Sequence, residues 1–374
     1  MSVARRGGVW TEERSDEGRR RTEAPRGANV GGTGMSALAV EAPGAGPLTP
    51  LLADPAVSDV LVNGRQVWVD RGPGLVRTGI RVGAPEDVRR LAQRLAAAAG
   101  RRLDEGCPFT DARLPDGTRL HAVLPPIAVD GPYLSLRTFR QRAFSLGDLV
   151  ANGTVSGAGA TVLAAIVAAR LACLVTGGTG AGKTTVLATL LGLVPRDERI
   201  VLVEDSAELR PTHPHVVTLQ ARTANVEGAG EVGLRALVRQ ALRMRPDRLV
   251  IGECRGAEVV DLLGALNTGH EGGAGTLHAN DPHDVPARLE ALGLLGGVPR
   301  AALHAQLAAA LQVVIHVRRT ESRQRVIDQV GLLLPDARGL VRAVPAWNGA
   351  PGPAAAALAR LLAQRGAPVP EALA

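Results

Sequence analysis

The chain has 374 residues, of which 45% are hydrophobic and 2% aromatic, and its formal net charge is +7. This length allows two domains with separate cores, and the basic balance permits binding to nucleic acid or to an anionic membrane surface. Arg, Gly or Pro interrupts the apolar stretches, so no membrane-spanning helix is expected. The three cysteines, Cys107, Cys173 and Cys254, lack the spacing of a zinc site and fit a reducing, cytoplasmic compartment.

The first part of the chain is expected to be a disordered segment followed by a small α+β domain. Residues 1–47 are rich in Arg and Gly and offer few apolar side chains to bury, with Met35 as an alternative start of translation. In the domain predicted at 48–145, Asn63-Gly64 is a tight-turn signal between two strands. The elements predicted there are strands at 59–63, 66–70, 119–125 and 133–140 and a helix at 85–99.

A linker or short helix predicted at 146–156 precedes the larger domain, 157–335. Its continuous apolar runs alternate with helical patterns, which predicts an α/β domain with a mostly parallel sheet covered on both faces. Residues 336–374 are rich in Ala and Pro and are expected to be a tail with at most a marginal helix. The elements predicted are strands at 171–176, 200–204, 216–219, 249–252, 275–278, 313–318 and 325–333 and helices at 183–192, 231–243 and 258–266.

Residues 177–184 match the phosphate-loop pattern G-x-x-x-x-G-K-[ST] and lie between a predicted buried strand and a predicted helix. Glycines allow backbone N–H groups to face phosphate oxygens, and the helix N-terminus adds partial positive charge. We expect Lys183 to reach the β- and γ-phosphates of ATP and the Thr184 hydroxyl to ligate Mg²⁺. The loop residues are Gly177, Gly178, Thr179, Gly180, Ala181, Gly182, Lys183 and Thr184.

Lys183 is the only lysine in the chain, and arginine supplies the other basic side chains. A planar guanidinium replaces a compact ammonium poorly where a single point charge must enter a narrow loop. The one retained lysine therefore supports a phosphate-binding role for this position.

Two predicted strands end in carboxylates, at the edge where open α/β sheets bind ligands. Glu204 could position or deprotonate the attacking water, and Asp205 could help to hold Mg²⁺ through water. Glu253 ends a strand that resembles a Walker B element without its usual aspartate, and it is our first choice for the water-polarising or metal-linked carboxylate. Taken alone, acidic residues at such a strand end more commonly cap a helix in contact with solvent. The phosphate loop on the same sheet favours the catalytic interpretation.

The segment 268–280 carries two histidines among several glycines, which indicates a close approach of backbone to a ligand. His270 and His278 have no third ligand nearby, so no metal site is predicted. His278 ends a short apolar strand and could sense the γ-phosphate, although a lone buried histidine is more often structural. Arginines of the first domain could neutralise phosphate charge, but spacing does not choose among them.

Together, these motifs resemble the secretion ATPase superfamily of type II and type IV secretion and pilus assembly. The chain looks most like the tight-adherence (Flp) pilus branch, the CpaF-like ATPases, over roughly residues 50–335. The tetracysteine zinc segment of the general secretory branch is absent. The stretches that carry the likeness are 177–185, 203–209 (the Asp box), 242–256 (Walker B) and 269–280 (the His box), with further matches at 130–139 and 222–230.

The resemblance implies a RecA-like P-loop NTPase sheet domain after a smaller N-terminal domain, with ATP between the two. It also implies a homo-hexamer at the cytoplasmic face of the membrane, attached through an inner-membrane platform protein. Direct nucleic-acid binding is not expected, because the sequence shows no nucleic-acid-binding domain. The residues that it implies are the catalytic Glu253, Glu204, His278 and Arg222 and, for the nucleotide, Thr185, Arg137 and Arg140 besides the phosphate loop.

The function predicted first is ATP hydrolysis by a hexameric motor that powers pilus assembly or secretion. A conjugation-type ATPase for DNA transfer is the alternative that the basic charge permits, although no nucleic-acid-binding domain is visible. A slow regulatory nucleotide-binding protein is a further alternative. A small-molecule P-loop kinase is disfavoured because the sequence shows no acceptor-site signature.

Overall fold

The structure is a computed structural model that describes residues 44–72, 74–138, 143–222 and 229–373. Most of the predicted N-terminal segment, with Met35, lies outside these residues, and so does Arg140. Within the described ranges, every helix is too short or too polar to cross a membrane.

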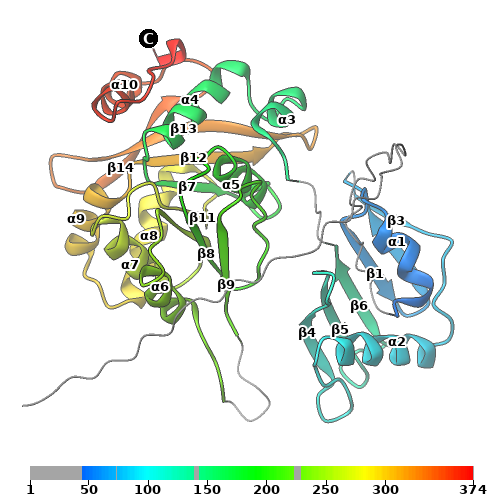
Figure 1. The fold of residues 1–374 in the computed structure, drawn as a ribbon. Helices are drawn as coiled ribbons and strands as arrows, with labels where there is room; N and C mark the ends of the chain where they lie inside the picture. The colour runs from blue at the N-terminus through cyan, green and yellow to red at the C-terminus, as the bar shows by residue number, and fades with distance from the viewer. Residues whose placement is uncertain (1–43, 73, 139–142, 223–228, 374) are drawn as a thin grey trace, which may run out of the picture. The chain divides into compact units, whose positions relative to one another are not determined.

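The first domain is built on a six-stranded antiparallel sheet in the order β3-β2-β1-β6-β5-β4 (Figure 1). At the predicted turn, Asn63 pairs with Gln66, and Gly64 has a positive φ of 56°, which glycine adopts readily. Alternating burial along the first two strands places valines in a core shared with the helices. The elements are η1 (Gly46–Leu48), α1 (Thr49–Ala53), β1 (Asp59–Asn63), β2 (Gln66–Asp70), β3 (Leu75–Arg77), α2 (Pro85–Ala98), β4 (Phe109–Arg113), β5 (Arg119–Val123) and β6 (Tyr133–Arg137).

The second domain is built on an eight-stranded sheet in the order β14-β13-β12-β7-β11-β10-β8-β9. The strands from β12 to β9 in this order are parallel, and β13 and β14 add an antiparallel edge. The strands are β7 (Cys173–Gly177), β8 (Ile200–Glu204), β9 (Val216–Gln220), β10 (Arg248–Cys254), β11 (Ala274–His278), β12 (Val313–Arg319), β13 (Arg325–Pro335) and β14 (Val341–Trp347).

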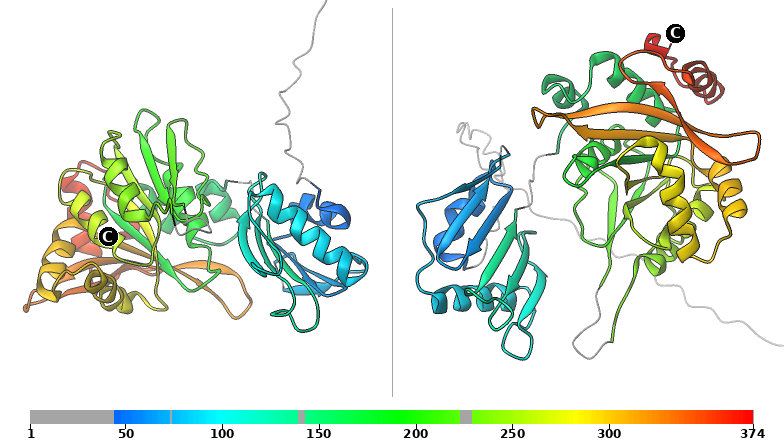
Figure 2. Two further views of the ribbon diagram at one scale, coloured as in Figure 1. Left: turned by 90° about the horizontal axis from the view of Figure 1, so that it is seen from below. Right: turned by 180° about the vertical axis from the view of Figure 1, so that it is seen from behind.

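Helices cover both faces of this sheet (Figure 2). One core cluster joins α4, α5 and α10 to one face, and another joins α6, α7, α8 and α9 to the opposite face. Neighbouring residues of β7, Leu174 and Val175, enter different clusters, which explains why the parallel strands are apolar throughout. The helices are α3 (Leu146–Ala151), α4 (Gly157–Ala168), α5 (Lys183–Leu191), α6 (Leu234–Leu242), α7 (Glu258–Leu266), η2 (Pro282–Asp284), α8 (Val285–Leu295), α9 (Arg300–Ala310), α10 (Ala355–Gln364) and η3 (Glu371–Leu373).

The C-terminal residues differ from the tail that was expected at 336–374. They form β14, which pairs with β13, and α10, whose Leu358 and Leu362 are fully buried. Trp347 is also buried, and a Cβ on Gly159 of α4 would collide with its ring. The alanine-rich composition conceals a helical face that packs on the sheet, so the second domain continues to residue 373.

Candidate nucleotide-binding site

The phosphate loop connects β7 to α5, in the order of strand, loop and helix that the sequence predicts. Gly177 has a φ of 148°, and a Cβ there would lie 2.1 Å from the carbonyl oxygen of Val317. Gly182 is the N-cap of α5 with a φ of 103°. Both positions therefore require glycine. Because glycine offers no side-chain acceptor, the first N–H groups of α5 have no side-chain cap and suit an anion.

The Lys183 ammonium lies inside the loop, and the residue is 7% exposed. Its Nζ donates to the carbonyl oxygens of Gly177 and Gly178, each at 3.0 Å, and lies 3.2 Å from Nδ1 of His278. Burial lowers the pKa of Lys183, and the charge of Glu253 partly counteracts this shift. The loop thus holds the ammonium at its own centre, within reach of a phosphate that enters the cradle.

A chain of polar contacts runs from Lys183 to the carboxylate predicted to be catalytic. Nε2 of His278 lies 2.8 Å from Oε1 of Glu253, and Nη2 of Arg255 donates to Oε2 of the same carboxylate. A neutral His278 can accept from Lys183 at Nδ1, while Oε1 of Glu253 lies close to Nε2 without a hydrogen-bond partner among the described residues. Burial, and then the charge of Lys183, lowers the pKa of His278 and favours this neutral form. The order β7-β11-β10 explains why these residues meet.

Glu204 has a structural task that the sequence did not reveal. The residue is 2% exposed, and its Oε1 accepts the backbone N–H groups of Glu208 and Leu209, both at 2.9 Å. Burial raises its pKa, and these two hydrogen bonds partly counteract the shift. A Cβ on Gly252 would lie 2.7 Å from Cγ of Glu204, so glycine makes room for this side chain. One carboxylate oxygen therefore fixes the turn after β8.

The second oxygen of Glu204, Oε2, is buried and has no hydrogen-bond partner among the described residues. An unpartnered buried carboxylate oxygen is costly unless a water or a cation satisfies it. A carboxylate oxygen and the Thr184 hydroxyl are both of the ligand type that Mg²⁺ prefers, and Mg²⁺ usually takes its other ligands from water and phosphate. The residues present therefore fit a nucleotide-bound Mg²⁺, although no cluster of three His, Cys, Asp or Glu side chains in the described ranges could hold a metal alone.

Asp205, predicted to help hold Mg²⁺, is an exposed residue directly after β8. Burial raises its pKa, and the nearby Arg255 counteracts this shift. Asp205, Arg255 and Glu258 line a cavity of 630 Å³ beside the N-terminus of α6. Asp205 thus shares a cavity with Arg255, the arginine that donates to Glu253.

The predicted arginines belong to different parts of the chain. The Arg222 guanidinium donates to the Gly230 carbonyl at 2.6 Å, and its backbone pairs with Val232. Arg137 is an exposed residue at the end of β6, and Arg140 lies outside the described residues. Sequence reasoning missed Arg255, for which the available signal was its position two residues after Glu253.

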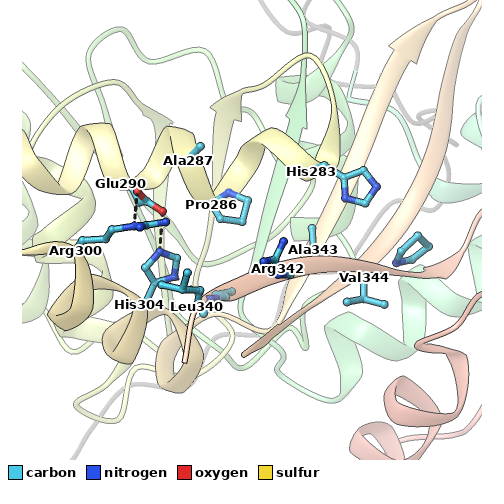
Figure 3. A pocket seen from close by; sticks show the side chains of 12 residues that line it. His283, Pro286, Ala287, Glu290, Arg300, His304, Leu340, Arg342, Ala343 and Val344 are labelled. Carbon is cyan, nitrogen blue, oxygen red and sulfur yellow. Dashed lines mark hydrogen bonds and ion pairs between the residues drawn. The ribbon is translucent and has the colours of Figure 1, made fainter. Parts of the chain in front are cut away.

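A second cavity, of 420 Å³, lies between α8, α9 and β14 (Figure 3). Its Glu290 accepts from Nε of Arg300 at 3.0 Å and faces Nε2 of His304 at 2.8 Å, while Nδ1 of His304 accepts the N–H of Val341. These polar groups already satisfy one another, and none of the predicted site residues lines the cavity. The phosphate loop therefore remains the candidate site.

Comparison with known proteins places the chain among secretion proteins. The family model described as type II/IV secretion system protein matches residues 41–344. A Mycobacterium tuberculosis protein, provisionally named a conjugal transfer protein, is 58% identical over 340 residues, which cover 88% of this chain and 96% of the relative. Conjugal transfer protein TrbB of Rhizobium radiobacter is 30% identical over 287 residues, which cover 75% and 84% of the two chains.

A solved structure supports the fold alone. The ATPase DotB of Yersinia pseudotuberculosis superposes with a TM-score of 0.57 and 17% sequence identity, covering 78% of each chain. The predicted fold, a small N-terminal domain followed by a P-loop ATPase sheet domain, is confirmed.

Proposed function

Because the chain belongs to the family of type II/IV secretion system proteins and is an ATPase of that family, we propose that it powers a conjugation-type secretion machine. The observation that carries the ATP-driven step is the phosphate loop with Lys183 at its centre, connected through His278 to Glu253. The conjugation-type assignment is supported by two relatives that are named for conjugal transfer.

In the proposed reaction, the loop amides and Lys183 bind the β- and γ-phosphates. Mg²⁺, when bound, supplies positive charge to the phosphate oxygens. Glu253 accepts hydrogen bonds from Arg255 and faces His278, and its carboxylate orients and deprotonates the attacking water. His278 exchanges its contact with Lys183 for one with the γ-phosphate. Glu204 holds the turn after β8, and its free Oε2 supports the water or metal beside Asp205.

The proposed assembly is a ring of six subunits that acts on an inner-membrane platform protein from the cytoplasmic face of the membrane. In this ring, Arg137, Arg140 and Arg222 are proposed to approach nucleotide and stabilise the charge of the transferred phosphoryl group. The support is the resemblance of the motifs and the family match.

Assembly of a tight-adherence pilus is the second candidate function. The observation that favours it is the occurrence of the stretches 130–139 and 222–230, which resemble that branch, together with the four nucleotide motifs. Both candidates use the same ATPase site, so they differ in the machine that the motor serves.

Deletion of the gene in its host separates the two candidates. We expect plasmid or chromosomal DNA transfer to fall to background while surface pili remain, and a wild-type copy, but not the Lys183→Ala variant, to restore transfer. Transfer frequency and electron microscopy of the cell surface measure the two outcomes in the same strains. Loss of pili with normal DNA transfer would instead support the pilus candidate.

A further inference from the structure

We propose that Arg255 is a positioning residue that holds the Glu253 carboxylate in place for the attack of water on ATP. This inference rests on the proposed role of Glu253 and assigns a role to Arg255, which lies in the Walker B stretch but was not predicted as a site residue. Arg255 follows β10 directly and lies two residues after Glu253, so both side chains are on the same side of the extended chain.

The first support is that Arg255 makes the hydrogen bond that the carboxylate has in the described part of the chain, whereas Oε1 of Glu253 is buried without a hydrogen-bond partner there. Nη2 of Arg255 lies 2.5 Å from Oε2 of Glu253, and Nε2 of His278 lies 2.8 Å from Oε1. His278 also contacts Lys183, which a phosphate will engage. The contact with His278 therefore depends on the nucleotide, whereas the contact with Arg255 does not. We therefore expect Arg255 to keep its hydrogen bond to Glu253 when the nucleotide binds.

The second support is that the backbone of Arg255 is itself fixed. The Glu258 carboxylate is buried, and its Oε1 accepts the backbone N–H groups of Arg255 and Gly256 at 2.5 and 2.7 Å. Gly256 has little room for a side chain, since a Cβ would lie 3.0 Å from Oε2 of Glu258. The turn between β10 and α7 therefore presents the guanidinium from a defined place.

The third support is the charge around the guanidinium. The hydrogen bond with Glu253 raises the pKa of Arg255, and the nearby charges of Glu253, Asp205 and Glu208 act in the same direction. A permanent positive charge between Glu253 and Asp205 reduces the repulsion of two carboxylates that approach the same ATP phosphates.

The test compares the full chain with the variants Arg255→Gln and Arg255→Lys, and with Arg239→Gln as a matched control. Arg239 lines the same cavity but lies 3.5 Å from Asp261 instead of Glu253. For each protein, steady-state kinetics gives kcat and KM, calorimetry gives the Kd of a non-hydrolysable ATP analogue, and thermal unfolding gives Tm. We expect Arg255→Gln to lower kcat by about 10- to 100-fold, the size of a misplaced catalytic group, with Kd changed less than about twofold.

Arg255→Lys should recover part of the lost kcat because it keeps the charge, and Arg239→Gln should behave as the wild type. Wild-type kcat in Arg255→Gln overturns the inference, and so does a loss of kcat that is matched by equal losses of affinity and Tm. The Glu253→Gln variant distinguishes a failure of the proposed role of Glu253 from a failure of the proposed role of Arg255. If it turns over ATP normally, the proposed role of Glu253 fails. If it is inactive while Arg255→Gln is fully active, only the role of Arg255 fails.

Discussion

Replacement of Lys183 by Ala is expected to weaken ATP-analogue binding at least about 100-fold, because it removes the charged donor at the centre of the loop. A hydrogen bond to a charged group contributes about 1.5–3 kcal/mol, and two such bonds to phosphates account for this loss. Lys183→Arg should not restore binding, since the wild-type side chain is almost fully buried between the Gly177 and Gly178 carbonyls. Isothermal titration calorimetry measures the affinity directly.

The matched control for this variant is Arg196→Ala. Arg196 is an exposed cation beyond the C-terminal end of α5, whereas Lys183 begins that helix. It should bind the analogue as the wild type does, which separates the loss of one specific ammonium from a change of net charge. Full binding by Lys183→Ala would count against the phosphate-loop assignment.

Glu253→Gln is expected to bind ATP with nearly wild-type affinity and to lose about 10²- to 10⁴-fold in kcat, the range of a general base. Glutamine has nearly the same shape and keeps an oxygen that can accept from Arg255, but it cannot take a proton from water. Phosphate release under saturating ATP measures kcat, and calorimetry checks that binding persists. Glu321→Gln, a change of an exposed glutamate between β12 and β13, is the control. Equal turnover in Glu253→Gln would reject this residue as the base.

The sequence predicted the elements around the phosphate loop closely because the signals there are local. The strand at 200–204 and the helix at 258–266 have the predicted bounds, and α5 begins at Lys183 as expected. Apolar runs of five residues between turn signals identify buried parallel strands well. The ends of those strands then indicate which carboxylates lie at the ligand-binding edge.

Other features depend on which strands become neighbours, and a linear pattern does not contain this information. The two backbone N–H groups held by Glu204 and the contact between Arg255 and Glu253 exist only once the turns after β8 and β10 are folded. The sequence analysis did not predict β14 and α10 as parts of the domain, because an alanine-rich segment shows little difference in hydrophobicity between buried and exposed positions. Spacing could not single out one arginine as a nucleotide-binding residue, since arginine is the common cation in this chain.

The central claim is that backbone amides around the Lys183 ammonium grip the triphosphate of ATP. A crystal structure of the chain with Mg²⁺ and a non-hydrolysable ATP analogue tests it most directly. The account predicts β- and γ-phosphates within the 177–184 loop, with Lys183 turned from the Gly177 and Gly178 carbonyls to the phosphates. An analogue bound elsewhere, with Lys183 still on those carbonyls, would contradict it.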